Sequence, residues 1–411
     1  MNNAISRSFT AAWVIPDNGP PISRGVVETA NGQIVRVGNS TLADSKTVDL
    51  GDVLLLPGFV NAHTHLEFSS LSNPLPQTHH DFAKWIREVI NWRRHRDEFR
   101  AESSKSMAIS TGLNESHRSG SAVVGEIATS PWLAEPLTSH AVPSVMFLEQ
   151  LGIFEDQSDN RLDEIRSALE ANDSLIPKGS RKLGISPHAP YSLSQALFRG
   201  LIELAREYHL PVAMHLAESC DEMNWLNHRT GPIAEFLDSM GMPIDDQHPL
   251  SITDYIQALS SVKHAMIIHG NYLQREEIET IGAAKDRVSV VFCPRTHLYF
   301  EHERYPLEQF LAYGINVAIG TDSRASNPDL DVLPELQLVR RQFPLLDPMT
   351  IFRMGTLNSA IALGWADSFG SINENKSATL LIVDCPVDIY REPLEWLLTA
   401  DRPSRRWLNH D

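Results

Sequence analysis

Cysteine is scarce in this sequence. The 411 residues include three, Cys220, Cys293 and Cys385, which are widely spaced and form no Cys-X-X-Cys pair. The odd number and the spacing indicate neither a disulfide framework nor a thiolate zinc site. We therefore expect the protein to work in a reducing compartment, the cytoplasm.

Long apolar runs and positive charge are also lacking. No apolar stretch approaches the roughly 20 residues that cross a membrane, and the first ten residues have no apolar core of the kind found in signal peptides. Lys and Arg total 35 against 52 Asp and Glu, which gives a formal net charge of −17. Nucleic acid and anionic membrane surfaces repel such a chain, so we expect neither as a partner.

The rest of the composition is that of a globular enzyme. Hydrophobic residues make up 42% of the sequence and charged residues 21%, which allows a large core and argues against disorder. A length of 411 residues suits either two or three average domains or one barrel-sized domain with an appendage. The alternation of apolar runs with helical stretches favours the second arrangement.

Eight apolar, strand-like runs occupy the middle of the chain and are separated by helical stretches. They end near His65, Glu126, Glu149, His188, His215, His269, Pro294 and Asp322. Eight such units over about 270 residues match the length of a (β/α)₈ barrel of the TIM type, an α/β fold. Active-site residues of that fold lie at the C-terminal ends of the strands, which is where these polar residues fall.

Both ends of the chain contain strands outside the predicted barrel. Three short strand-like stretches lie near the N-terminus, and Asn31-Gly32 is a strong hairpin turn between the last two. Residues 377–384 form another strand with no barrel partner in the sequence. We therefore predict a small composite β domain from residues 1–54 and 367–411, and a barrel over residues 55–366.

Four residues at the predicted strand ends form a candidate metal site. His63 and His65 are two residues apart at the end of one strand, so both side chains point to the same face. His215 and Asp322 end later strands in the same way. Three imidazoles and one carboxylate suit one Zn²⁺ or Fe²⁺ ion, with a position left for water.

This ligand set favours hydrolysis, because a divalent ion lowers the pKa of a bound water to about 7. Glu218, three residues after His215, is placed to accept the water's proton and pass it to the substrate. His269 can orient the hydroxide, and Asp322 can accept a second proton. Taken singly, Glu218 is a common helix N-terminal acid and Asp322 a common turn residue. The prediction therefore depends on the fact that all these residues follow the ends of strand-like runs.

These motifs together resemble the amidohydrolase superfamily, and in particular its mononuclear deaminases of cytosine, guanine and S-adenosylhomocysteine. Residues 57–65 are similar to the family's first-strand motif, 215–218 to its fifth-strand HxxE, and 320–322 to its eighth-strand signature. Binuclear members carry a carbamylated lysine at the end of the fourth strand, where this sequence has His188. The resemblance implies one metal ion and a hydrolase acting on carbon–nitrogen bonds. We expect the protein to bind a small-molecule substrate, and the sequence leaves open whether it forms a homo-oligomer.

A shorter segment bears on the substrate. Residues 65–69, followed by Phe82, Trp85 and Val89, are similar to the aminodeoxyfutalosine deaminases of the alternative menaquinone pathway, which replace the 6-amino group of an adenine nucleoside by oxygen. The resemblance implies aminodeoxyfutalosine as substrate, with S-adenosylhomocysteine, methylthioadenosine, cytosine or guanine as alternatives. The long loop over residues 68–77 either covers the pocket or is a plain surface connection.

Three further residues are candidate substrate contacts. Glu126 and His188 each end a strand, where they either hydrogen-bond a ribose or ring edge or serve the barrel structure. Arg295 either pairs with a carboxylate of the substrate or forms an ion pair with an acid at the barrel mouth. It lies in Arg295-Thr296-His297, where related deaminases tend to have Arg-Ser-Asn.

Two other functions stay open at this point. One is a different hydrolase chemistry on the same scaffold, such as the opening of a cyclic amide or the dechlorination of a triazine. The other is a barrel protein without catalytic activity that acts through partners. The intact ligand set and Glu218 argue against this last alternative.

Overall fold

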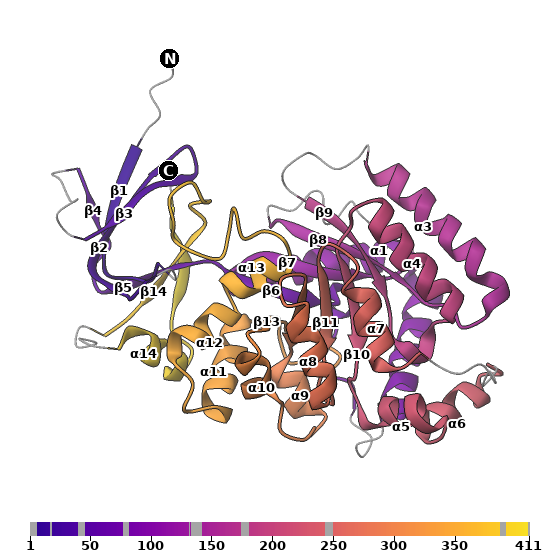
Figure 1. Cartoon of the computed structure of the whole chain (residues 1–411). Helices are drawn as coiled ribbons and strands as arrows, with labels where there is room; N and C mark the ends of the chain where they lie inside the picture. The colour runs from indigo at the N-terminus through magenta and orange to yellow at the C-terminus, as the bar shows by residue number, and fades with distance from the viewer. Residues whose placement is uncertain are drawn as a thin grey trace.

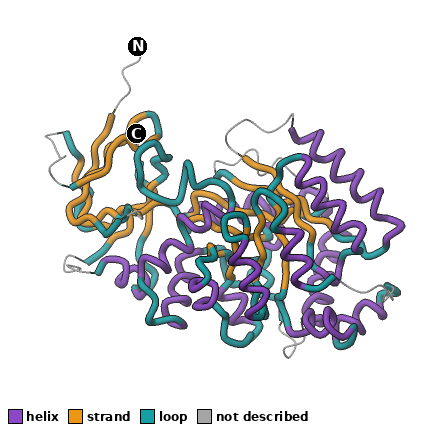
Figure 2. The backbone as a smooth tube through the Cα atoms, viewed as in Figure 1, coloured by secondary structure: helices purple, strands orange, loops and turns teal. Residues whose placement is uncertain are grey.

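The structure is a computed structural model that describes residues 6–16, 19–39, 46–76, 82–130, 132, 142–173, 181–242, 250–386 and 392–409. Its strands form two sheets, one of eight strands and one of seven. In Figure 1 the seven-stranded sheet lies at the left of the eight-stranded one, and Figure 2 shows the helices packed around the outside of the larger sheet.

The larger sheet is parallel throughout and follows the chain order β6 to β13. Its strands are β6 (Phe59–Thr64), β7 (Ser121–Ala128), β8 (Ser144–Gln150), β9 (Arg181–Pro187), β10 (Val212–Leu216), β11 (Ala265–His269), β12 (Val288–Phe292) and β13 (Asn316–Ile319). A bridge between Thr64 and Asp322 joins the first strand to the end of the last one. The predicted (β/α)₈ barrel is therefore confirmed.

Helices cover the outside of the barrel. They are α1 (Phe82–Arg118), α3 (Ser158–Asp173), α4 (Gln195–Glu207), α5 (Cys220–His228), α6 (Pro232–Ser239), α7 (Ile252–Leu259), α8 (Arg275–Ala283), α9 (Pro294–Tyr299), α10 (Leu307–Ala312), α11 (Val332–Gln342), α12 (Pro348–Met354), α13 (Leu357–Ala362) and α14 (Pro393–Thr399). Short 3₁₀ turns η2 (Leu66–Phe68), η3 (Glu155–Gln157) and η4 (Pro190–Ser192) follow three of the strands. No helix among the described residues has both the length and the apolar character that crossing a membrane requires.

The barrel strands are buried on both faces, as expected for a parallel sheet covered by helices. Every residue of β10, β11 and β12 is buried. One set of strand residues packs with the helices, including Met214, Ile267 and Val290. The alternate set, including Phe147 and Ile268, forms a separate cluster that fills the interior. The polar strand ends are thus fixed on a rigid, fully packed support.

The smaller sheet joins both ends of the chain. Its order is β15 (Arg405–Trp407), β14 (Leu380–Asp384), β5 (Val53–Pro57), β1 (Ser6–Val14), β2 (Ile22–Ala30) and β3 (Gln33–Gly38), and β4 (Val48–Asp49) pairs with β1. The predicted hairpin is present, with positive φ at Asn31 and Gly32. Strand β5 also belongs to this sheet and runs from residue 53 to residue 57, across the predicted boundary between residues 54 and 55. The exact limits of the two domains stay a prediction.

Candidate metal centre and catalytic site

The predicted metal ligands converge at the C-terminal ends of β6, β10 and β13. The Nε2 atoms of His65 and His215 are 3.4 Å apart. Asp322 Oδ1 lies 3.6 Å from His63 Nε2 and 3.7 Å from His65 Nε2. Ligands bound about 2.1 Å from one cation at angles of roughly 90° to 120°, as in a five-coordinate site that keeps a position for water, are about 3.0 to 3.6 Å from each other. These separations suit ligands of a single ion, and ring nitrogens of His63, His65 and His215 also lie within 4.8 Å of one another.

Backbone contacts fix the ligands in this arrangement. The amide of Asp322 donates to the carbonyl of His63 over 3.0 Å. His215 Nδ1 lies 3.2 Å from the carbonyl oxygen of His188, so this nitrogen carries the proton and Nε2 keeps its lone pair for a cation. A Cβ at Gly320 would lie 2.7 Å from that of His63, which explains why glycine precedes Thr321-Asp322.

The protonation states also suit a cation. Burial lowers the pKa of His65 to about 3 and that of His215 well below its usual value, so both imidazoles are neutral. Although burial acts to raise the pKa of Asp322, the surrounding histidines hold it below its ordinary value, so the group is a carboxylate. Both ring nitrogens of His63 are buried without a hydrogen-bond partner among the described residues. Such orphaned polar atoms are costly, and an ion bound at Nε2, the nitrogen beside Asp322, would satisfy one of the two.

Glu218 and His269 face each other beside these ligands, with 3.4 Å between Glu218 Oε1 and His269 Nε2. Burial raises the pKa of Glu218 well above its ordinary value, and the charges of Asp322 and Glu222 add to the effect. Burial lowers the pKa of His269 to about 3. The pair is thus a carboxyl group that retains a proton readily beside a neutral imidazole.

Glu222 positions Glu218 and was not predicted from the sequence. Its carboxylate accepts from the amides of Ala217, over 3.0 Å, and Glu218, over 2.8 Å. These bonds hold the turn in which Ala217 has a φ of 54°. Burial raises the pKa of Glu222 to about 7. The pattern Ser219-X-X-Glu222 is a helix N-cap signal that points to a buried turn here, although not to its contact with Glu218.

A cavity of about 350 Å³ opens onto this cluster. We use the term cavity floor for His65, His215, Glu218, His269 and Asp322, which line the cavity and have His63 buried next to them. We use the term cavity wall for six apolar residues from α1, α6 and the loops nearby, namely Phe82, Trp85, Ile86, Phe154, Phe236 and Met242. The volume lies within the range of pockets that hold small molecules.

His188 lines the cavity, whereas Glu126 does not. Burial lowers the pKa of His188 to about 3, and its Nδ1 lies 2.7 Å from Ser192 Oγ, so the other ring nitrogen can face a ligand. Glu126 is buried and accepts from Thr64 Oγ1, over 2.8 Å, and from the amide of Leu66, over 3.0 Å. The geometry therefore does not support the predicted substrate contact of Glu126, which instead holds the hydroxyl of Thr64 and the backbone amide of Leu66, on either side of His65.

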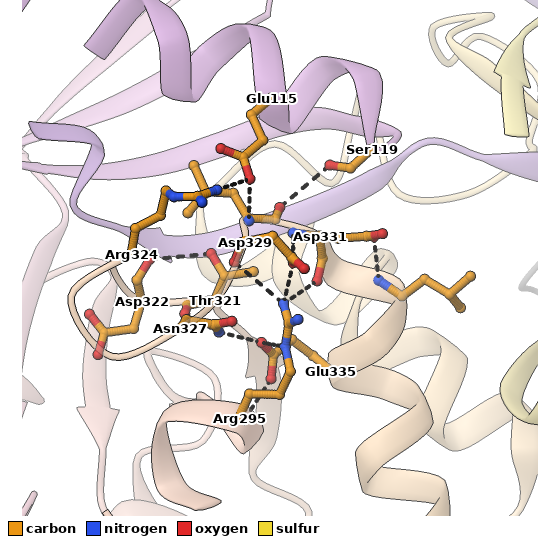
Figure 3. Close-up of polar contacts among 12 residues, drawn as sticks. Glu115, Ser119, Arg295, Thr321, Asp322, Arg324, Asn327, Asp329, Asp331 and Glu335 are labelled. Carbon is orange, nitrogen blue, oxygen red and sulfur yellow. Dashed lines mark hydrogen bonds and ion pairs between the residues drawn. The ribbon is translucent and has the colours of Figure 1, made fainter. Parts of the chain in front are cut away.

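The predicted substrate contact of Arg295 is likewise not supported. Its Nε donates to Glu335 Oε1 over 2.7 Å and its Nη2 to Asp329 Oδ1 over 2.7 Å. The side chain is 14% exposed and is not part of the cavity lining. Figure 3 shows it among Glu335, Asp329 and Asp331. Of the two interpretations of Arg295, the geometry favours the ion pair at the barrel mouth.

Two other arginines reach the cavity. Arg93 of α1 donates to Glu67 Oε1 over 2.7 Å and lies over the ring of Phe68. Arg161 of α3 donates to Glu164 Oε2 over 3.1 Å, in a pair whose side chains are 40% and 51% exposed. Both come from helices, whose placement over the barrel mouth cannot be inferred from local sequence.

The first loop anchors part of this mouth. Phe68 lines the cavity, and the amide of Leu75 donates to the carbonyl of Ala325 over 2.9 Å. Residues 68–76 of the predicted loop are described and begin at the cavity, whereas its last residue, Gln77, lies outside the described residues.

Comparison with known proteins gives one consistent family. The amidohydrolase family profile matches residues 54–402. The aminodeoxyfutalosine deaminase of Deinococcus radiodurans is 28% identical over 77% of this chain and 75% of its own length. The 5-methylthioadenosine/S-adenosylhomocysteine deaminase of Syntrophobacter fumaroxidans is 27% identical over 95% and 87%. Helicobacter pylori aminofutalosine deaminase, solved with methylthio-coformycin, has the same fold, with a TM-score of 0.82, 22% identity and 97% of each chain covered.

Proposed function

The chain belongs to the amidohydrolase family and is a hydrolase acting on carbon–nitrogen bonds, and from that premise we propose that it removes the 6-amino group of an adenine nucleoside. The observation that carries the proposal is the cavity floor, where neutral imidazoles and a carboxylate meet Glu218 and His269. Deamination by water needs a cation, a proton carrier and a hydrogen-bond donor at one reacting carbon, and this floor has residues for each role.

We assign His63, His65, His215 and Asp322 as the ligands of one divalent ion, either Zn²⁺ or Fe²⁺. Such an ion supplies Lewis acidity, which lowers the pKa of a water molecule to about 7. Strand β9 is followed by His188 and not by lysine, so the chain lacks the bridging group that a second ion of the family's binuclear kind requires.

The proton transfers are assigned to Glu218 and Asp322. Glu218 takes a proton from the attacking water and delivers it to the ring nitrogen next to the attacked carbon, which makes that carbon electrophilic. Its raised pKa suits a group that must hold the proton between the two steps. Asp322 accepts the second proton of the water, and His269 Nε2 hydrogen-bonds the new oxygen. Asp322 then passes its proton to the amino group, the carbon–nitrogen bond breaks and ammonia leaves, while the proton delivered by Glu218 stays on the ring nitrogen of the 6-oxo product.

The cavity wall bears on the nucleoside that is accepted. Its aromatic and aliphatic side chains suit an apolar 5′ substituent better than a free hydroxyl. Arg161 lies at the same cavity, and its exposed pair with Glu164 is worth little, so a carboxylate on a ligand can replace that partner. We therefore propose aminodeoxyfutalosine, which has an extended acidic 5′ substituent, as the preferred substrate. This assignment would place the enzyme in menaquinone biosynthesis.

Methylthioadenosine and S-adenosylhomocysteine are the main alternatives, because relatives with those names match the chain as well as the aminodeoxyfutalosine deaminases do. A methylthio group would also contact the cavity wall favourably. His188 is assigned to a hydrogen bond with the nucleoside in either case. The cytoplasmic location and an oligomeric state stay predictions from the sequence.

The test is ammonia release from a panel of adenosine, methylthioadenosine, S-adenosylhomocysteine and aminodeoxyfutalosine by the metal-loaded protein. We expect ammonia from the substituted nucleosides, with the highest kcat/KM for aminodeoxyfutalosine. A preference for a neutral nucleoside would overturn the substrate assignment and leave deamination intact. Ammonia from none of them, together with ring opening of a cyclic amide or chloride release from a triazine, would overturn the proposed function.

A further inference from the structure

The loop that carries Asp322 is tied from behind by a buried polar network (Figure 3). We use the term Asp322 loop for residues 321–331, which connect β13 to α11. Asp322 itself has a φ of 57°, a left-handed conformation that is uncommon for residues other than glycine, although aspartate adopts it more readily than most, and that surrounding contacts stabilise.

Asn327 lies at the centre of the network and is fully buried. Its Nδ2 donates to the carbonyl of Thr321 over 2.7 Å and to Glu335 Oε1 over 2.7 Å. Asn327 therefore joins the residue before Asp322 to helix α11, across the inside of the loop. An aspartate at this position would have no proton to donate and would repel Glu335.

Arg295 completes the network from α9. Its backbone amide and its Nε both donate to Glu335, over 2.8 and 2.7 Å. Its Nη2 donates to Asp329 Oδ1 over 2.7 Å and to the carbonyl of Asp331 over 3.0 Å. One guanidinium group thus ties the end of the Asp322 loop to the same carboxylate that holds Asn327.

The beginning of the loop is tied directly to the metal ligands. The amide of Thr321 donates to Asn61 Oδ1 over 3.1 Å, and Asn61 Nδ2 donates to Thr321 Oγ1 over 2.8 Å. The amide of Asp322 donates to the carbonyl of His63. Ser326 Oγ, from the same loop, donates to Asp322 Oδ2 over 3.1 Å, and the amide of Ser323 donates to Oδ1 over 2.8 Å, on the oxygen that lies nearest His63 and His65.

We propose that Arg295, Glu335 and Asn327 are positioning residues that hold Asp322 in its left-handed conformation, so that its carboxylate faces His63 and His65. The proposal uses the assignment of Asp322 as a metal ligand made above. It gives Arg295 a role that needs no contact with substrate. Outer partners of metal ligands typically contribute 10- to 100-fold to metal affinity.

The variants for the test are Arg295→Met, which removes the charge, Arg295→Lys, which keeps it, and Asn327→Asp, which removes two donated hydrogen bonds. The matched control is Arg340→Met. Arg340 lies on α11, the helix of Glu335, and its Nε donates to Glu395 Oε1 of α14 over 3.1 Å. Its Nη1 donates to the carbonyls of Pro344 and Leu346, so its hydrogen bonds within the described residues do not reach the Asp322 loop. Arg295→Met and Arg340→Met thus each remove one arginine–glutamate pair that involves α11.

Zinc affinity, measured by competition with a chelator and without substrate, is the first readout, and kcat and KM the second. We expect Arg295→Met and Asn327→Asp to weaken zinc binding by at least about tenfold and to lower kcat while KM changes by less than about threefold. Arg295→Lys should recover part of the affinity. Arg340→Met should bind zinc like the wild type, even if it loses as much thermal stability as Arg295→Met does.

Wild-type zinc affinity in both Arg295→Met and Asn327→Asp would overturn the proposal, because two independent breaks of the network would then leave Asp322 in place. An equal loss of affinity in Arg340→Met would overturn it as well, since general destabilisation would explain the result. Zinc binding is read without a nucleoside, so a failure of the proposed deaminase function would appear separately, as absent ammonia with the expected zinc affinities.

Discussion

The cavity floor and the cavity wall are built in different ways. The floor comes from the ends of barrel strands, and three of its turns have a positive φ at a residue other than glycine, namely at Ala217, His269 and Asp322. The wall comes from helices α1 and α6 and from loops, and consists of aromatic and aliphatic side chains. Of these two parts, the floor, which carries the titratable groups, has such turns, and none of the six wall residues has a positive φ.

The cavity floor and the cavity wall have different tasks. The floor must place a few atoms at fixed distances, which requires rigid strands and enforced turns. The wall has to match the shape and polarity of a substituent, which packing of helix side chains achieves without strain. Changes in the floor should therefore affect every substrate alike, and changes in the wall should affect substrates differently.

The largest effect is expected for His215→Ala. The variant lacks a ligand and should lose both the metal and the Lewis acidity, which is worth several kcal/mol, so ammonia release should fall by about 10⁴-fold or more for every nucleoside. Metal analysis and kcat/KM check this. The control is His95→Ala, because His95 is exposed on α1 and its Nδ1 lies 2.7 Å from the carbonyl oxygen of Asn91, away from the cavity lining. Full metal content in His215→Ala would refute the ligand assignment.

Glu218→Gln should cost about 10²- to 10⁴-fold in kcat, again for all substrates, because the amide keeps the shape of the side chain but cannot carry the proton. The metal content should stay that of the wild type, since Glu218 is assigned no ligand bond. Purified variants compared by metal analysis and steady-state kinetics decide this. An active Glu218→Gln enzyme would show that the proton takes another route.

Arg161→Ala should separate the substrates, in contrast to the two changes in the floor. A hydrogen bond between charged partners is worth about 1.5–3 kcal/mol, so kcat/KM for the acidic aminodeoxyfutalosine should fall roughly 10- to 150-fold, and that for methylthioadenosine should change little. The control is Arg166→Ala. Arg166 lies on the same helix, pairs with Asp163 over 3.2 Å and does not line the cavity. Equal losses for both nucleosides would mean that Arg161 serves the structure.

The smallest effect concerns stability and comes from Glu149, which lies beside the floor without lining the cavity. Both its oxygens are buried without a partner among the described residues, and burial raises its pKa from near 4.5 to about 7. The folded protein then binds this proton more tightly than the unfolded chain does. The free energy of unfolding should therefore fall as the pH rises from about 4.5 to about 7.

Glu149→Gln removes the titrating group, so the metal-free variant should show a flatter dependence over this pH range, by about 1–3 kcal/mol. Urea unfolding of both proteins at a series of pH values measures it. The same slope in both proteins would contradict the assignment. A change in the ratio of kcat/KM between the acidic and the neutral nucleoside would mean that Glu149 takes part in selection of the substrate.

Most of the floor could be predicted from the sequence because each residue ends an apolar run. A run such as Ala265–Ile268 fixes where a strand stops, and the barrel brings all the strand ends to one face, so ligand atoms of His269 and Asp322 lie within 4.8 Å of each other despite the distance between them in the chain. The chemistry of imidazole and carboxylate then limits what such a group can bind. The fold and its hairpin at Asn31-Gly32 were predictable for the same local reason.

The wall and the outer partners could not be predicted in this way. Glu335 lies 40 residues beyond Arg295, and no local pattern tells which acid its guanidinium reaches. Arg161 lies in a helix with an ordinary charged sequence, α3, and its place at the cavity depends on how that helix packs over the barrel mouth. Side chains on helices depend on how each helix packs, and the packing angle is a property of the whole fold.

Titration of the metal-free protein with Zn²⁺, while ammonia release from methylthioadenosine and aminodeoxyfutalosine is followed, tests the central claim most directly. The account predicts activity that rises in proportion to the added metal and levels off at about one ion per chain. Full activity without metal, a plateau at two ions per chain, or no ammonia from either nucleoside at any metal content would contradict it.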